Sequence, residues 1–391
     1  MMHFKCVNLD NFSLSLMHSS DAKMKKLIPL TLTSIGLFLS SAVIGAPFMA
    51  VGDSAELFVT GTVGIRADDN VFLTANPLSD VIFDVNPGLD LTFGKNSQFK
   101  GSFTLVDSIA KYSDNSNLDT NLVATNFQSG FDDGKLKLNF NVGYNELNQN
   151  AADIRGLTRR DVFSAGAKGE VEISQITSVG AGVAFNQENY KRRTYSDSSS
   201  LTLPLDFFYK VTPKVDLSVG YRYRSYQVDI GEDSGDHFFN VGARGDFTPK
   251  LSGRVAVGLN TRQLERSGNE NQFGLDANLN YEISPKTRLT LGAGNDFATS
   301  PQGQQQKNLT LNAALTFSLT QEWSANAGLN YRRIGYAARS DDYLEGQLGA
   351  AYIVNANIRI VGGYTYRNYS SVLAGSEFSN NVFSIGANLR Y

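Results

Sequence analysis

The chain has 391 residues, of which 19% are charged, 41% hydrophobic and 11% aromatic, and its formal net charge at pH 7 is −3. A near-neutral balance without clusters of Lys and Arg excludes a nucleic-acid surface, so no nucleic-acid partner is expected. The one cysteine, Cys6, precedes the export signal described below, which excludes disulfide and thiol chemistry from the mature protein. The slightly polar mean hydropathy does not exclude a membrane protein, because the two faces of a barrel strand cancel in any average.

Residues 24–50 have the three parts of a secretory signal peptide. A basic start at Met24 is followed by an apolar stretch and then by small residues that end near Ala50. We therefore expect residues 1–23 to be an extended or mis-assigned N-terminus and residues 51–391 to be the mature protein. An uncleaved membrane anchor is the alternative, since about twenty apolar residues can span a bilayer.

From residue 56 onward, apolar residues recur at every second position, the period of a β-strand whose two faces meet different surroundings. The longest polar loop, 67–80, is expected to fold inward as a constriction. Tight turns follow near 94–97, 132–134 and 174–176. The segments between turns and loops are longer than an average strand of a soluble protein, which has about five or six residues. They are long enough to cross the hydrocarbon of a membrane, which takes a strand of about 9 to 11 residues.

An internal repeat occupies the second half of the chain. Pro213, Pro249 and Pro285 each lie in a Thr/Ser-Pro-Lys turn and follow one another at a spacing of 36 residues, and further turns are expected at 320–322 and 354–356. This spacing accommodates one hairpin of two long strands. Longer polar loops alternate with the turns at 191–199, 229–235, 265–270, 298–306, 336–342 and 371–377.

Short turns on one side and longer loops on the other are typical of outer-membrane barrels. The sequence therefore predicts an all-β fold, an antiparallel transmembrane β-barrel of about 18 strands with both termini periplasmic. The predicted location is the bacterial outer membrane. Aromatic residues near strand ends are expected to form interfacial girdles, namely Phe247, Phe317, Trp323, Tyr336, Tyr352 and Tyr369.

Charged residues fall on the strand face that the alternation assigns to the lumen. The lumen-facing candidates are Arg222, Arg224, Arg254, Arg262, Arg288, Arg332, Arg359, Arg367 and Asp216, with Arg244, Lys137 and Asp246 beside them. Two interpretations are open. Rings of Arg select anions in many pores, whereas Arg paired with carboxylates braces the barrel wall.

The last strand places apolar side chains and a terminal aromatic residue on one face. These residues are expected to be the signal that the barrel-assembly machinery reads, and they are Phe383, Ile385, Ala387, Leu389 and Tyr391. The machinery is therefore one expected partner, together with outer-membrane lipid and lipopolysaccharide.

Several short motifs connect the chain with a known family. These are Asn86-Pro87-Gly88-Leu89, the Tyr-Ser pairs that begin at Tyr112, Tyr195 and Tyr369, the Thr/Ser-Pro-Lys turns, and Asn388-Leu389-Arg390-Tyr391. With them the mature chain resembles the bacterial putative β-barrel porins of the second type. The resemblance implies an outer-membrane pore-like barrel, and for some members a role beside polysaccharide-export components.

No residue pattern indicates catalysis, a cofactor or a metal. His237 is the only histidine of the mature chain, and the alternation places it on the lipid side near the outer rim. Acidic loop pieces such as Asp68-Asp69-Asn70 lack the spacing of a calcium loop and are interpreted as solvated charge. The predicted function is therefore a non-enzymatic, porin-like channel for hydrophilic solutes or an exported polysaccharide. The alternative is a non-conducting surface barrel whose loops bind partners.

Overall fold

The computed structural model describes residues 47–149 and 157–391. Most of the expected signal peptide, and all of residues 1–23, lie outside the described part. That part contains one short 3-10 helix, η2 (Ser116–Leu118), and no helix in it is long and apolar enough to cross a membrane. Everything else regular in it is β-strand. The strands are β1 (Met49–Val51), β2 (Ala55–Asp68), β3 (Asp80–Phe93), β4 (Phe99–Tyr112), β5 (Thr120–Asp132), β6 (Leu136–Gln149), β7 (Thr158–Ser174), β8 (Thr177–Tyr190), β9 (Ser198–Thr212), β10 (Val215–Val228), β11 (Ser234–Asp246), β12 (Leu251–Leu264), β13 (Gly268–Ser284), β14 (Thr287–Thr299), β15 (Gln305–Ser318), β16 (Trp323–Gly335), β17 (Ser340–Ile353), β18 (Ile358–Ser370) and β19 (Phe378–Arg390).

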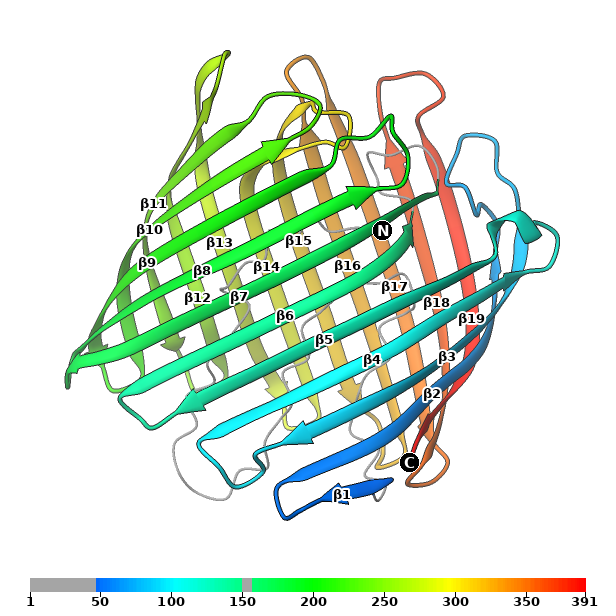
Figure 1. Cartoon of the computed structure of the whole chain (residues 1–391), viewed down its shortest axis with the longest axis horizontal. Coiled ribbons are helices and arrows are strands. Elements are labelled where there is room, and N and C mark those ends of the chain that lie inside the picture. The colour runs from blue at the N-terminus through cyan, green and yellow to red at the C-terminus, as the bar shows by residue number, and fades with distance from the viewer. Residues whose placement is uncertain (1–46, 150–156) are drawn as a thin grey trace.

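The long strands β2 to β19 form one closed antiparallel barrel of 18 strands (Figure 1). Each strand pairs with its chain neighbours, and β19 pairs with β2 from Val382 opposite Asp68 to Arg390 opposite Thr60. The short β1 pairs with the beginning of β2, at the end of the barrel where β19 stops. Closure removes the open sheet edge, whose unpaired N–H and C=O groups would each cost several kcal/mol in hydrocarbon. The prediction of a closed antiparallel barrel of 18 strands is confirmed.

The connections differ between the two ends of the barrel. Short turns join β3 to β4, β5 to β6 and every later odd-numbered strand to the next, at the positions that the sequence predicts. We call this the turn end, and both Ala55 and Arg390 lie there. Longer connections, such as 69–79 and 371–377, lie at the opposite end, which we call the loop end.

The two faces of the wall differ sharply in polarity. On β9, Leu203, Leu205 and Phe207 are 41–53% exposed on the outer face, whereas Thr202 and Asp206, at alternating positions, are buried on the inner face. This pattern is the reverse of that in a soluble protein, where each exposed leucine would lose about 1.5–3 kcal/mol of stabilisation from burial. The outer face therefore suits hydrocarbon.

The expected aromatic girdle is correct only in part. Phe317 and Trp323 are exposed on the outer face near the turn end, and Tyr352 packs against Trp323 with ring centroids 4.8 Å apart. The prediction is wrong for Tyr369, which is buried in an interior cluster with Ile334, Tyr343 and Phe378. It is also wrong for Tyr336, which packs against this cluster. The reason is the strand period of two: Tyr369 lies two residues after Arg367 and so shares its inward face.

Candidate functional site

The barrel interior is identified by contacts between distant strands. Arg244 on β11 bonds to Glu170 on β7 at 2.6 Å, and Arg224 on β10 bonds to Asp296 on β14 at 3.1 Å. Strands this far apart in the wall approach only across its concave side. All of these residues lie on the strand faces opposite the exposed leucines, so the polar face lines the interior.

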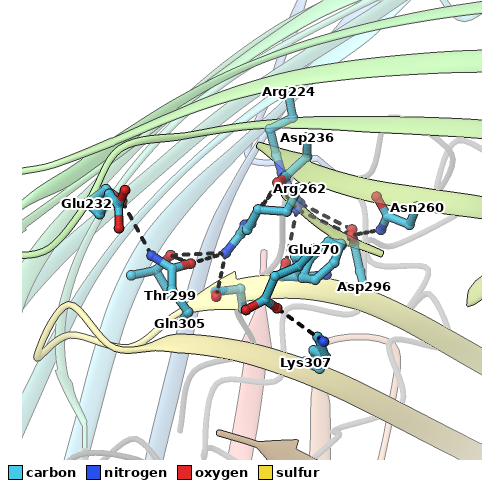
Figure 2. A network of polar contacts seen from close by, with 12 residues as sticks. Arg224, Glu232, Asp236, Asn260, Arg262, Glu270, Asp296, Thr299, Gln305 and Lys307 are labelled. Carbon is cyan, nitrogen blue, oxygen red and sulfur yellow. Dashed lines mark hydrogen bonds and ion pairs between the residues drawn. The ribbon is translucent and has the colours of Figure 1, made fainter. Parts of the chain in front are cut away.

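A buried network of ion pairs fills the interior near the loop ends of β10, β11, β12 and β14 (Figure 2). Asp236 accepts hydrogen bonds from Arg224 at 2.5 Å and from Arg262 at 2.7 Å, and these three side chains are at most 4% exposed. Asp296 accepts from Arg224 and, at 2.5 Å, from the amide of Asn260. We call Arg224, Asp236, Asn260, Arg262 and Asp296 the latch network, because its two arginines also bind the hairpin of β14 and β15.

The loop end of β14 leaves the wall and leans into the barrel. The β13–β14 ladder stops at Leu275 opposite Asn295, whereas the β14–β15 ladder continues to Thr299 opposite Gln305. Residues 268–274 of β13 therefore pair with β12 alone. Across the gap, Glu270 of β13 instead forms an ion pair at 3.1 Å with Lys307 of β15, as Figure 2 shows.

The latch network binds this bent hairpin through its backbone. The guanidinium of Arg224 donates to the carbonyl oxygen of Phe297 at 2.9 Å, and that of Arg262 donates to the carbonyl oxygen of Ala298 at 2.8 Å. Arg262 also donates to the side chain of Gln305 at 2.6 Å. The two arginines therefore join the β14–β15 hairpin to strands β10 and β12 across the concave inner side of the wall.

Three loops cover the hairpin. The backbone N–H of Ser196 donates to the carbonyl of Pro301 at 2.8 Å, which joins the β8–β9 loop to the β14–β15 loop. Gly231 and Gly303 approach so closely that a Cβ on Gly231 would lie 2.8 Å from the Gly303 oxygen, and both have positive φ. Glu232 accepts from the Ser267 hydroxyl at 2.6 Å, a bond that lowers the pKa of this exposed loop carboxyl.

The loop that the sequence places at 67–80 also folds inward. Its Leu73 packs against the buried interior cluster of Ile334, Tyr343, Tyr369 and Phe378. Asn70 of the same loop donates to the carbonyl of Ser379 at 3.0 Å. Leu73 has a φ of 49°, a left-handed conformation that branched residues rarely adopt. Packing therefore holds the loop in place against backbone strain.

A second buried polar group lies beneath this loop. Arg367 donates to Glu345 and to Asn380, both at 2.8 Å, and Asn380 in turn donates to Asp68 at 2.6 Å. The hydroxyl of Tyr343 donates to Glu345 at 2.9 Å. Strands β17, β18, β19 and β2 are thus tied together inside the barrel near its loop end.

Most of the remaining lumen-facing candidates also lie against carboxylates or are buried. Arg222 lies 2.9 Å from Asp296, and Asp216 lies 3.0 Å from Arg244. Arg254 lies 3.6 Å from Asp206. Arg332 and Arg359 are buried on the inner face, at 5% and 2% exposure.

Arg288 differs from the other arginine candidates because its side chain is 41% exposed, at the turn end, where it pairs with the exposed Glu282. Sequence reasoning missed Arg66 with Asp84 and Arg390 with Asp90, although the same alternation would have found them. In the second pair the two residues come from opposite ends of the chain, so only the closed ring brings them together.

The interior that remains accessible is lined mainly by uncharged amides and hydroxyls. Asn126 on β5 is exposed although it faces inward, and inward side chains on β4 to β6 and β13 to β16 are partly exposed. These amides include Gln128, Asn139, Asn141, Asn278, Asn280, Asn312 and Asn326. Within the described residues, Gln272, Asn308 and Asn312 each keep one buried side-chain polar atom without a hydrogen-bond partner.

The C-terminal residues expected to form the assembly signal face outward. Phe383, Ile385, Leu389 and Tyr391 are 42–62% exposed. His237 lies on the outer face of β11 near the loop end, where its Nδ1 is 2.8 Å from the Tyr221 hydroxyl. No group of three or more His, Cys, Asp or Glu side chains in the described ranges could hold a metal ion.

Comparisons with known proteins return barrels of low sequence similarity. OpdL of Pseudomonas aeruginosa is 12% identical, with 87% of this chain and 99% of that chain covered and a TM-score of 0.47. OpdQ of the same species (10% identical, 87% and 100% covered) and OccAB2 of Acinetobacter baumannii (9%, 87% and 98%) have the same TM-score. No curated protein matches. Residues 232–391, from the loop before β11 to the C-terminus, match the family described as putative beta-barrel porin 2, which confirms the resemblance over this part of the chain.

Proposed function

We propose that this chain is an outer-membrane channel through which small hydrophilic solutes diffuse passively. The observation that carries the proposal is the division of the closed wall into an apolar outer face and a polar inner face that stays partly exposed. The family match over residues 232–391 supports it. A barrel of this size leaves an aqueous channel unless the interior is plugged.

The proposed orientation places the loop end outside the cell and the turn end, with both termini, in the periplasm. Short periplasmic turns and longer external loops are usual for bacterial barrels. Export through cleavage of a signal peptide at residues 24–50 belongs to the same proposal, as does recognition of the last strand by the barrel-assembly machinery. The chain is proposed to have no catalytic role.

The lining favours neutral, hydroxyl-rich solutes over anions. Inside the barrel Arg224, Arg262 and Arg367 lie against carboxylates, so little of their charge is left to attract an anion. The partly exposed amides of β5, β6, β13, β15 and β16 both donate and accept hydrogen bonds, which matches the hydroxyl groups of sugars and other polyols. An exported polysaccharide strand presents the same hydroxyl groups and remains a proposed cargo, with export components as proposed partners.

Single-channel recording in planar bilayers tests the proposal. The purified barrel should give discrete conductance steps with a reversal potential near zero in a KCl gradient, because uncharged amides and hydroxyls make up most of the accessible lining. Replacing Asn126 and Asn312 by Lys should shift the reversal potential toward anions, because both side chains line the accessible interior. A barrel that inserts but gives no steps at any salt concentration contradicts the proposal.

The inward loop and hairpin also favour a second candidate, a non-conducting surface barrel whose loops bind partners. Both elements place apolar side chains in the interior at the loop end, among them the partly buried Leu73 and the buried Phe297. Under this alternative no variant of the lining would change ion flow.

A further inference from the structure

The outer face of the barrel carries a row of ion pairs at the loop end of β4 to β8. Lys111 pairs with Asp119 at 2.9 Å, Arg159 with Glu146 at 3.2 Å, and Lys191 with Asp161. In each pair the cation is the more exposed partner: the three cations are 45–63% exposed and the three acids 16–26%. The acids therefore lie beneath the cations and hold them at the surface.

The row is continuous between neighbouring strands and extends to two further cations. The backbone N–H of Lys191 donates to the carbonyl of Arg159 at 2.9 Å, and the guanidinium of Arg159 reaches the carbonyl of Asn121 at 3.4 Å. Arg192 and Arg193, which follow directly, are exposed and form no ion pair with any residue in the described ranges. We call Arg159, Lys191, Arg192 and Arg193 the cationic row.

An apolar surface lies directly below the cationic row, toward the turn end. Val123, Phe163 and Val183, on β5, β7 and β8, are 36–40% exposed on the same outer face. On the adjoining wall, the outward positions at the loop ends of β9 to β12 carry uncharged residues such as Ser199, Gln227 and Gln263. The cationic row therefore does not continue onto β9 to β12, and the outward cations Lys307 and Arg333 on β15 and β16 are separate from it.

We propose that the cationic row binds the phosphate groups of lipopolysaccharide in the outer leaflet. The ligand must carry acyl chains that cover Val123 and Phe163 and several negative charges held close together above them. Adjacent strands lie about 4.8 Å apart, so Arg159 and Lys191 can bind one phosphorylated headgroup together. The inference rests on the orientation proposed above, in which the loop end meets the outer leaflet.

The experiment measures binding of lipopolysaccharide to the full mature barrel in detergent. The variant replaces Arg159, Lys191, Arg192 and Arg193 by Gln, and the matched control replaces Lys307 and Arg333, exposed outward cations on β15 and β16, by Gln. The four-site variant should bind lipopolysaccharide at least about tenfold more weakly, because each cation near an anionic lipid surface contributes favourable binding free energy. The control variant should bind like the unmodified protein.

Further arms identify the ligand chemistry and separate the two proposals. Dephosphorylated lipopolysaccharide and phosphatidylglycerol vesicles should both bind the unmodified barrel weakly; equally tight binding of phosphatidylglycerol would contradict recognition of lipopolysaccharide. Equal loss in the variant and the control, or no loss in the variant, would overturn the inference. Conductance steps from the four-site variant would show that it is folded and would leave the channel proposal intact whatever the binding result.

Discussion

At the scale of single residues, the interior arginines brace the wall. Asp236 is at most 4% exposed between Arg224 and Arg262, so its charge is compensated by both. The alternation of the sequence could place each of these residues inward. It could not pair Arg224 with Asp296 four strands away, because that contact depends on how sharply the closed wall curves.

We predict that Asp236→Asn destabilises the barrel by about 3–5 kcal/mol, because it leaves two buried guanidinium groups without their shared carboxylate. Unfolding in urea, followed by the gel shift between folded and heat-unfolded barrel, measures this. Arg288→Gln is the control, since its pair with Glu282 is exposed and should contribute under about 1 kcal/mol. Similar losses in both variants would contradict the bracing role.

At the scale of elements, turns were predictable and the bend in β14 was not. The regular Pro213, Pro249 and Pro285 spacing located turns to within a residue or two, because proline restricts the local backbone directly. By contrast, β14 alternates regularly through Asn295. Its departure from β13 is fixed by Arg224 and Arg262 on other strands, and such contacts leave no trace in the local period.

The hairpin gives a test at this scale. The double variant Arg224→Gln/Arg262→Gln removes the donors to the carbonyls of Phe297 and Ala298, so the hairpin should lean out and the single-channel conductance should rise. Arg333→Gln, on the outer face, should leave the conductance unchanged. Unchanged conductance in a folded double variant would mean that the hairpin does not limit the channel.

We predict that Leu73 anchors the inward loop at residues 69–79. Leu73→Ser removes the side chain that packs against the buried interior cluster, while the strain of its φ of 49° remains. The loop should then detach, and limited proteolysis should cut within 69–79 in the variant alone. The folded barrel should otherwise keep its gel mobility. Equal protection of the loop in both proteins would show that Leu73 does not anchor it.

At the scale of the whole molecule, closure depends on the final strand. β19 completes the ring with β2, and the backbone of Tyr391 exchanges two hydrogen bonds with Val59, at 2.7 and 2.9 Å. The sequence predicted the strand number from turns alone, because each hairpin contributes two strands. It did not predict how far β19 and β2 are offset, which follows from the slant of all strands around the ring.

If the last strand is read during assembly, Tyr391→Ser should lower the fraction of folded barrel in the outer membrane. Tyr281→Ser, another outward tyrosine of comparable setting near the turn end, should leave that fraction unchanged. Comparing the folded fractions by gel shift in isolated membranes measures this. Equal fractions in both variants would show that Tyr391 is not part of the signal.

The central claim, that one face of the wall meets water and the other lipid, is tested most directly by thiol labelling in vesicles. Residues 51–391 contain no cysteine, so single cysteines can be placed at Asn126 and Asn312 inside and at Val142 and Leu311 outside. A charged, membrane-impermeant thiol reagent should label the two inner positions and spare the two outer ones. Labelling of Val142 and Leu311, or of neither inner position, would contradict a water-filled barrel in a bilayer.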